Sequence, residues 1–209
     1  MSVKQCHHHG GGKKKLLKKI GIVFGILCII VLLIFFLTWA ILQPKSPRFV
    51  LQDATIYGFN VSAPILLSSN YQVTISSRNP NSKIGIYYDK LDVFATYHNQ
   101  QITYFTVIQP VYQGHKEVNI WSPFVYGTNV PIAPYNGASL SQDQSNGAIA
   151  LVIKINGRVR FRVGSFISRR YHIHVTCQAY IPFGNKNSGI AGVVTGVKYQ
   201  LAQKCSVNV

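Results

Sequence analysis

The chain has 209 residues and a formal net charge of +16, with 21 Lys and Arg against only 5 Asp and Glu. Gly, Ser, Asn, Val, Ile and Tyr are plentiful after Leu42, and no long helical pattern occurs there. This composition suits β-structure. About 165 residues beyond Leu42 are enough for one domain with its own core.

An apolar run without any charged residue extends from Ile20 to Leu42. As a helix it is long enough to cross the roughly 30 Å hydrocarbon core of a bilayer. A cleaved signal peptide is the alternative, but its apolar part is usually shorter, about 7 to 15 residues, and ends at a small-x-small site. The best such site here, Thr38-Trp39-Ala40, contains a bulky Trp. The sequence therefore favours an uncleaved signal-anchor.

Charge around this run predicts its orientation. The preceding residues include Lys13, Lys14, Lys15, Lys18 and Lys19, whereas only Lys45 and Arg48 follow closely. Because basic residues stay in the cytosol, we expect a single-pass type II protein. Residues 1–19 are then a cytosolic basic tail, 20–42 the transmembrane helix, 43–48 a spacer and 49–209 an extracellular domain.

The cysteines separate by compartment under this topology. Cys6 is cytosolic and Cys28 lies within the bilayer, while Cys177 and Cys205 are both extracellular. Disulfides persist outside the cell, so we predict a bond between Cys177 and Cys205.

Strands alternate with turn signals along the rest of the chain. Apolar periodicity predicts strands at about 49–61, 71–76, 84–97, 102–108, 117–121, 149–163, 171–180 and 193–201. Loops are expected at 98–101, 109–116 and 183–192, and prolines and Gly137 break the chain between 123 and 137. The polar segment 138–147 is expected to be one helical turn or a loop. Within 84–97 the apolar parity changes at Asp89-Lys90, which predicts a bulge or tight bend.

About eight short strands without a convincing helix indicate an all-β domain, an antiparallel β-sandwich preceded by one transmembrane α-helix. It is not an ordinary immunoglobulin domain, because Trp121 precedes both extracellular cysteines. The sequon Asn60-Val61-Ser62 makes Asn60 a candidate glycosylation site.

The strand at 149–163 carries the candidate binding surface. Its apolar residues share one parity and Lys154, Arg158, Arg160 and Arg162 share the other, with Arg169 and Arg170 just beyond. Side chains alternate across a strand, so we expect a basic face. Without acids between them in the sequence, these cations favour an anionic partner. The alternative is a solvated strand face whose charges prevent edge pairing.

Signals for an enzyme are weak. The sequence has no G-x-S-x-G elbow and no Gly-rich phosphate loop. Turn chemistry explains Asp89 and Asp92 better than a catalytic carboxylate pair does. His172 and His174 share a strand face, where surface histidines are favoured over metal ligands. We therefore expect no catalytic residue, no metal and no cofactor.

Several motifs in order resemble one plant family. They are Asn79-Pro80-Asn81, Gly85-Ile86-Tyr87-Tyr88-Asp89, Tyr112-Gln113-Gly114-His115-Lys116, Gly157-Arg158-Val159-Arg160-Phe161-Arg162-Val163-Gly164 and the terminal Lys204-Cys205-Ser206-Val207-Asn208-Val209. Together they resemble the non-race-specific disease resistance and harpin-induced-like family, which carries the group 2 late-embryogenesis-abundant domain. The resemblance implies a fibronectin type III-like sandwich without catalytic activity. It also implies a plasma-membrane protein, enriched at plasmodesmata in some relatives and linked to pathogen defence and the hypersensitive response.

The sequence predicts a membrane-anchored protein that acts by binding, and the resemblance implies a role in defence or stress. The candidate partners are immune receptors, a second copy of the chain, anionic lipid and acidic cell-wall polysaccharide, and nucleic acid is not expected outside a cell. The alternative function is a lipid-binding or membrane–cell wall adhesion module without a signalling role. A lipid-binding module would need a hydrophobic groove between its sheets.

Overall fold

The computed structural model describes residues 11–41, 44–62, 65–182 and 197–209. The chain divides into two units, Met1–Gln43 and Pro44–Val209. The first contains helix α1 (Gly11–Ile41), which begins before the predicted span, while Leu42 lies outside the described residues. Within α1, Lys18–Leu37 has a mean hydropathy of 3.4 and the length needed to cross a membrane.

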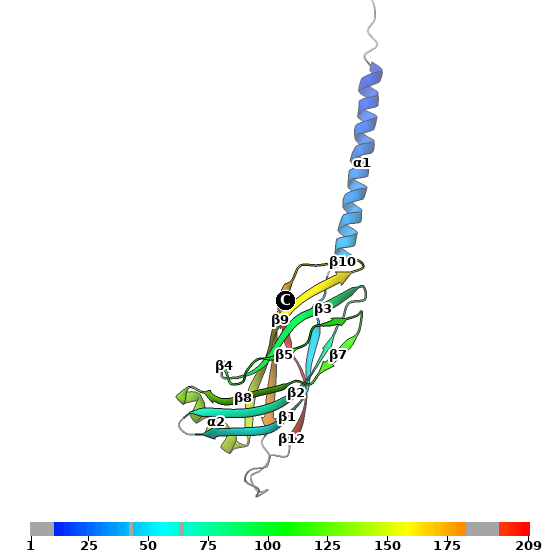
Figure 1. Ribbon diagram of the computed structural model, residues 1–209. Coiled ribbons are helices and arrows are strands. Elements are labelled where there is room, and N and C mark those ends of the chain that lie inside the picture. The colour runs from blue at the N-terminus through cyan, green and yellow to red at the C-terminus, as the bar shows by residue number, and fades with distance from the viewer. Residues whose placement is uncertain (1–10, 42–43, 63–64, 183–196) are drawn as a thin grey trace, which may run out of the picture. The chain divides into compact units, whose positions relative to one another are not determined.

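The second unit is built from two antiparallel sheets (Figure 1). The first sheet contains β1 (Arg48–Ser62), β2 (Leu66–Arg78), β7 (Val118–Trp121), β8 (Phe124–Pro131) and β12 (Val197–Lys204). The second contains β3 (Ile84–Tyr97), β4 (Gln100–Gln101), β5 (Thr106–Ile108), β6 (Val111–Gln113), β9 (Ala148–Val163), β10 (Phe166–Ile167), β11 (Tyr171–Pro182) and β13 (Ser206–Asn208). The predicted all-β antiparallel sandwich is confirmed.

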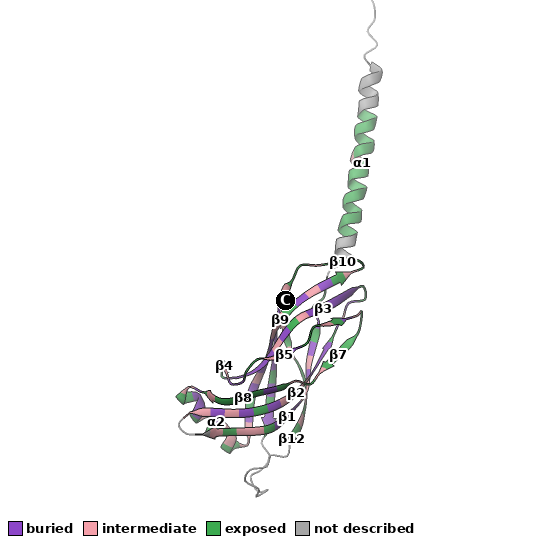
Figure 2. Cartoon of the chain, in the orientation of Figure 1, coloured by how far each residue is buried: buried purple, intermediate pink, exposed green. Residues whose placement is uncertain are grey.

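Alternating side chains form the core between the sheets (Figure 2). In β9, Leu151, Ile153 and Ile155 are buried, and in β2 the buried positions include Tyr71 and Val73. This inward parity leaves the intervening side chains of each strand on the outer faces. The sandwich therefore has two outer faces, and packing of the core does not determine which residue types lie on them.

The change of parity in β3 is a bulge, as the sequence predicted. The register of β3 against β9 shifts between Tyr88 and Lys90. Ile86 and Tyr88 before the shift and Leu91 and Val93 after it are all buried. The extra residue thus keeps both apolar sets on the core face.

The segment from 98 to 116 differs from the sequence interpretation. Only His98 and Asn99 form the predicted hairpin loop, because Gln100 already pairs with Tyr97 as part of β4. Both loop residues have positive φ angles. The predicted strand at 102–108 is limited to β5, and the predicted loop at 109–116 contains β6. Short pieces against one long strand carry too little periodicity to be recognised.

The prolines between 123 and 137 delimit elements that the sequence interpretation missed. Pro123 precedes β8, Pro131 ends it and Pro134 opens α2 (Pro134–Asn146), where a missing N–H costs nothing. Gly147 closes the helix with a left-handed φ of 84°. The expectation of one helical turn or a loop is therefore wrong. Its cause is that Leu140 alone among the apolar helix residues is buried, so α2 has no apolar stripe.

The C-terminal part joins the two sheets. The chain leaves β12 in one sheet, passes through Cys205 and continues as β13 beside β11 in the other. Cys205 forms a disulfide with Cys177 of β11, which confirms the predicted bond. The predicted loop at 183–192 and the start of the predicted strand at 193–201 lie outside the described residues.

Candidate binding surface

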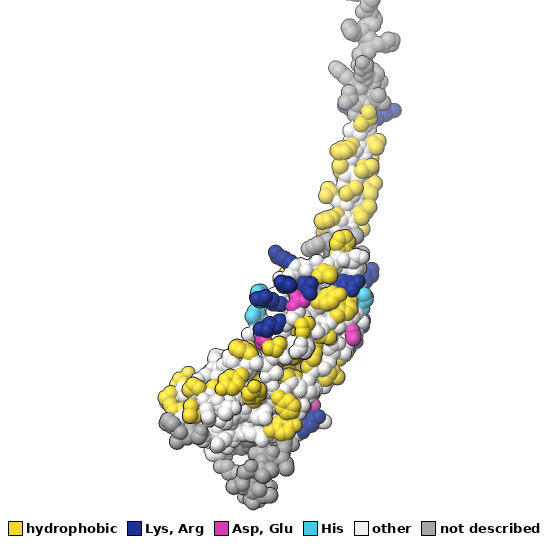
Figure 3. Space-filling model, in the orientation of Figure 1, with side chains coloured by type: hydrophobic (Ala, Val, Ile, Leu, Met, Phe, Trp, Pro, Cys, Tyr) yellow, Lys and Arg dark blue, Asp and Glu magenta, His cyan; other side chains and the backbone are white. Residues whose placement is uncertain are grey.

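The outer face of the second sheet places basic side chains on three adjacent strands. Arg158 of β9 lies in register with Lys90 of β3 on one side and His172 of β11 on the other. Figure 3 shows the dark blue Lys and Arg side chains gathered in this part of the domain. We call the set of Lys154, Arg158, Arg160, Arg162, Arg169 and Arg170 the basic face.

Asp89 lies within the basic face, contrary to the expectation that no acid separates the cations. The bulge in β3 presents its carboxylate to β9, where Arg160 Nε donates to both oxygens at 3.0 and 2.9 Å. Arg170 Nε donates to Oδ2 at 3.3 Å. The hydrogen-bonded Arg160 guanidinium holds the pKa of Asp89 below its ordinary value, and Asp89 in turn raises the pKa of Arg160.

Tyrosine rings orient several of the arginines. The guanidinium carbon of Arg160 lies 5.4 Å from the ring centre of Tyr87, and that of Arg162 lies 5.9 Å from the ring centre of Tyr112. Arg162 also donates to Tyr87 Oη at 3.1 Å. Cation–π contacts and hydrogen bonds to the same rings restrict the guanidinium planes, so part of the basic face is ordered before any ligand arrives.

Arg158 and Lys154 differ from these ordered arginines. Among the described residues neither forms an ion pair, and Arg158 is exposed. The nearby pair of Lys90 Nζ and Asp92 Oδ2, at 2.9 Å, neutralises the second acid of this face. Among the described residues, positive charge without an acidic partner therefore extends along β9 from Lys154 through Arg158 to Arg162.

The two histidines lie side by side at the edge of the basic face. The rings of His172 and His174 are stacked with centres 6.5 Å apart, and His174 Nδ1 hydrogen-bonds Asn156 Oδ1 at 3.0 Å. Both are exposed. Within the described ranges no group of three or more His, Cys, Asp or Glu side chains could hold a metal ion.

The remaining predicted site residues lie elsewhere. Asn60 is exposed on β1, far along the chain from β9, and its glycosylation stays a prediction. Lys13, Lys14 and Lys15 fall within α1, but their side chains are outside the described set. Lys18 and Lys19 are exposed at the start of the apolar segment.

A surface hollow of about 520 Å³ lies where β1 begins and β12 ends. Phe49, Val50 and Val207 contribute apolar lining, and Arg48 and Lys204 are basic residues at its edge. Sequence reasoning missed it, since its walls come from residues 46–50 and 204–207, which only the fold brings together. Such a hollow combines features that an amphipathic molecule needs.

Sequence reasoning also missed Asp89, Tyr87 and Tyr112 as parts of the basic face. The parity change at Asp89 was visible, but nothing in the sequence states that β3 and β6 lie beside one another and that β3 lies beside β9. Strand order, not local pattern, brings these side chains to the arginines.

Comparisons with known proteins identify the family. A sequence model of the family described as "Late embryogenesis abundant protein" matches residues 74–178. The chain is 62% identical over 187 residues to NDR1/HIN1-like protein 1 of Arabidopsis thaliana, covering 87% of this chain and 90% of the relative. It is 56% identical to NDR1/HIN1-like protein 12 of the same plant, covering 100% of each. The chain therefore belongs to the late embryogenesis abundant protein family and, within it, to the NDR1/HIN1-like proteins.

Proposed function

We propose that this protein is a single-pass, type II plasma-membrane protein that acts in plant defence or stress responses by binding, without catalysis. Family membership supports the role in defence or stress. The apolar helix α1 supports anchoring, and the Cys177–Cys205 disulfide is consistent with an extracellular domain.

The observation that carries the binding function is the unpaired charge at Arg158 and Lys154, bordered by arginines that are already oriented. A polyanion gains Coulomb attraction there, and the neighbouring Arg160 and Arg162 side chains lose little entropy because they are already ordered. Acidic cell-wall polysaccharide is the partner best matched to an extended row of cations along a strand. Anionic lipid and an acidic surface of a protein, including an immune receptor, present the same charge in other forms.

Neutralising basic residues of the full-length protein in neutral-lipid nanodiscs tests this function. Lys154→Gln, Arg158→Gln and Arg169→Gln together should abolish most binding to polygalacturonate at low salt, since surface charge pairs are screened by added salt. Arg160 is kept, because its removal would leave Asp89 without its main partner. The matched control removes three charges elsewhere, with Lys45→Gln, Arg78→Gln and Lys204→Gln.

The two triple variants distinguish binding at the basic face from an effect of the net charge of the protein. Retained binding in the control and lost binding in the first variant support the proposal. Equal losses would reduce the effect to net charge, and binding unaltered in the first variant would refute the basic face. Binding to vesicles that contain anionic lipid tests lipid as the partner. Cross-linking in plant cells tests an acidic protein as the partner.

The topology has its own test. Protease added to intact cells should digest the domain from Pro44 to Val209, and an endoglycosidase should change the mobility of the wild type but not of Asn60→Gln. A domain that is protected and unglycosylated would place it in the cytosol and contradict the proposal.

Lipid binding is the second candidate function, favoured by the hollow beside Phe49 and Lys204. Its apolar walls and basic edge fit an acyl chain with an anionic headgroup. Native mass spectrometry of the full chain, released from lipid mixtures, should then show one retained lipid, lost in Val207→Trp. A spectrum of lipid-free protein would exclude this function.

A further inference from the structure

A large part of the outer face of the first sheet carries no charge. Between residues 54 and 77, and again between 118 and 142, the sequence contains no Lys, Arg, Asp or Glu, although the whole chain has a net charge of +16. Those segments include most of β1, all but the last residue of β2, and all of β7 and β8. The charged residues of the first sheet lie in the first part of β1, at the end of β2 and on β12: Arg48, Asp53, Arg78, Lys198 and Lys204. We call the remaining, uncharged part of this outer face the neutral face, in contrast to the basic face of the second sheet.

Exposed aromatic rings lie on this neutral face. The register places Gln72 of β2 opposite Phe124 of β8, and Asn70 opposite Tyr126. Phe124 is 48% exposed, Tyr126 51% and Tyr57 of β1 40%. Soluble proteins rarely leave neighbouring large rings in water without a binding role. We call Tyr57, Phe124 and Tyr126 the aromatic row.

The rings of the aromatic row are held in place. Tyr57 lies against Phe124 with centres 5.6 Å apart, and its hydroxyl donates to Gln72 Oε1 at 2.9 Å. Tyr126 is in edge contact with Tyr104 at 5.8 Å, whose hydroxyl donates to Thr128 O at 3.0 Å. Because the rings are fixed, a ligand that stacks on them loses little protein entropy.

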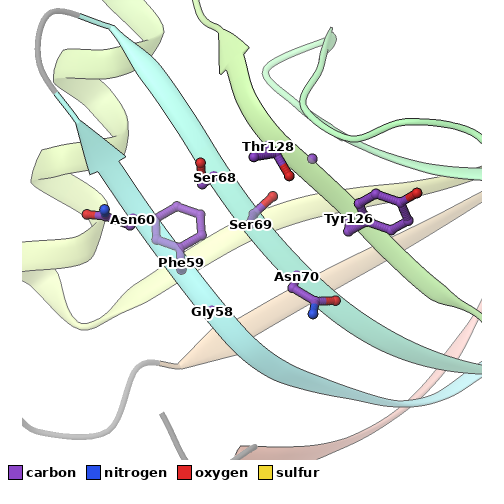
Figure 4. A pocket seen from close by; sticks show the side chains of 9 residues that line it. Gly58, Phe59, Asn60, Ser68, Ser69, Asn70, Tyr126 and Thr128 are labelled. Carbon is purple, nitrogen blue, oxygen red and sulfur yellow. The ribbon is translucent and has the colours of Figure 1, made fainter. Parts of the chain in front are cut away.

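A depression of about 300 Å³ lies beside Tyr126, across β1, β2 and β8 (Figure 4). Gly58 lies in its wall, and a Cβ built there meets no atom within 4 Å. Asn60 and Asn70 bring two side-chain amides to it, and within the described part of the chain neither amide makes a hydrogen bond. The depression thus combines open space with unused donors and acceptors.

We propose that this face binds a neutral polysaccharide chain, with pyranose rings stacked on the aromatic row and hydroxyl groups bonded to the amide of Asn70. A pyranose ring with equatorial substituents presents C–H groups on both faces, and these pack against the electron-rich face of an aromatic ring. Its hydroxyls both donate and accept, as amides do. The aromatic row and the depression beside it are lined by uncharged residues, so an acidic polymer gains nothing there over a neutral one. A β-linked glucan has equatorial ring substituents and no charge, and it is therefore the ligand class that we propose.

Titration of the full-length protein in detergent with cellohexaose, a soluble β-1,4-linked glucose hexamer, tests the proposal. Calorimetry should detect weak binding that added salt leaves unchanged. Phe124→Ala and Tyr126→Ala should each weaken it about five- to tenfold. Gly58→Leu should also weaken it by filling the depression, since a Cβ at Gly58 meets no atom within 4 Å. The control is Tyr180→Ala, which removes an equally exposed ring (64%) from β11 in the other sheet.

The following results would contradict the proposal. Absence of heat with cellohexaose, or equal weakening by Tyr180→Ala, would refute the site. A wild-type dimer that becomes monomeric in Tyr126→Ala would show that a second copy covers the face. Binding by Asn60→Gln protein but not by glycosylated wild type would show that the chain's own glycan fills the depression. The basic-face triple variant should bind cellohexaose normally, so this proposal and the proposed function fail separately.

Discussion

The outer face of the sheet around β9 and the outer face of the sheet around β2 cover the same core but offer different chemistry to solvent. On β9, Arg158 and its neighbours are cations with one strong acidic partner, Asp89. On β2, the outward residues are amides and hydroxyls beside exposed rings such as Tyr126. Inward positions on both strands are similar aliphatic and aromatic residues.

This difference is the basis on which we propose two separate binding modes for one small domain. The inward parity of each strand is set by the core, while the outward parity is free to differ between the sheets. Attraction at the basic face is Coulombic and weakens with salt, whereas stacking at the aromatic row does not depend on salt. A salt series with both probes therefore separates the two faces in one protein.

The largest effect is expected from breaking the covalent link between the sheets. Cys205→Ser removes the disulfide to Cys177, which closes a loop with a sequence separation of 28. In the chain-entropy model this lowers the free energy of unfolding by roughly 3 to 4 kcal/mol. The melting temperature should fall by roughly 10 °C, measured by circular dichroism without reductant.

The control for this variant is Cys28→Ser, which changes a cysteine of α1 outside the sandwich. It should leave the melting temperature of the domain unchanged. If Cys205→Ser has the same melting temperature as the wild type, the disulfide contributes nothing to stability. The packing of the core would then hold the two sheets together without it.

An intermediate effect is expected from one glycine in each sheet. A Cβ at Gly157 of β9 would meet Lys90 O at 2.1 Å and Leu91 Cδ2 at 2.6 Å, so Gly157→Ala should cost about 1 to 3 kcal/mol of stability. A Cβ at Gly58 of β1 meets nothing within 4 Å, so Gly58→Ala should change stability by less than about 0.5 kcal/mol. Urea unfolding of the two variants measures the contrast. Equal destabilisation would contradict the close approach of β9 to the β3 bulge.

The strongest alternations were readable from the sequence. The strand at 149–163, the bulge at Asp89-Lys90 and the bond between Cys177 and Cys205 each follow from a local pattern or from compartment. Long strands that are half buried repeat their signal often enough to be recognised. Helix α2 was not recognised, because it packs through few apolar residues.

Only part of each candidate surface could be predicted from the sequence. Alternation in β9 placed the basic residues on one face, but the partner Asp89 comes from β3, and strand order is not encoded in local pattern. The aromatic row had a signal in the uncharged stretches at 54–77 and 118–142, but its rings come from strands β1 and β8 that the fold brings to either side of β2. Non-local pairing decides which side chains meet.

A small effect on stability, with a larger effect on binding, is expected at Asp89. Asp89→Asn leaves Arg160 and Arg170 without their acidic partner, so polygalacturonate should bind more tightly at low salt. Stability should fall only slightly, by a few degrees in melting temperature, since exposed ion pairs contribute little. Cellohexaose binding should stay unchanged, because the aromatic row belongs to the other sheet.

The contribution of the Asp89–Arg160 ion pair to stability should depend on pH in a defined direction. The pKa of Asp89 is held below its ordinary value by Arg160, so the pair stabilises the fold above the unfolded-state pKa of about 3.9. That stabilisation is lost as the pH falls through the lowered pKa of the folded state. The difference in melting temperature between wild type and Asp89→Asn should therefore be constant near neutral pH and shrink below about pH 4. A difference that grows on acidification would mean that Asp89 is not held ionised by Arg160. The basic face would then be positive without an internal acid, as its sequence alone suggests.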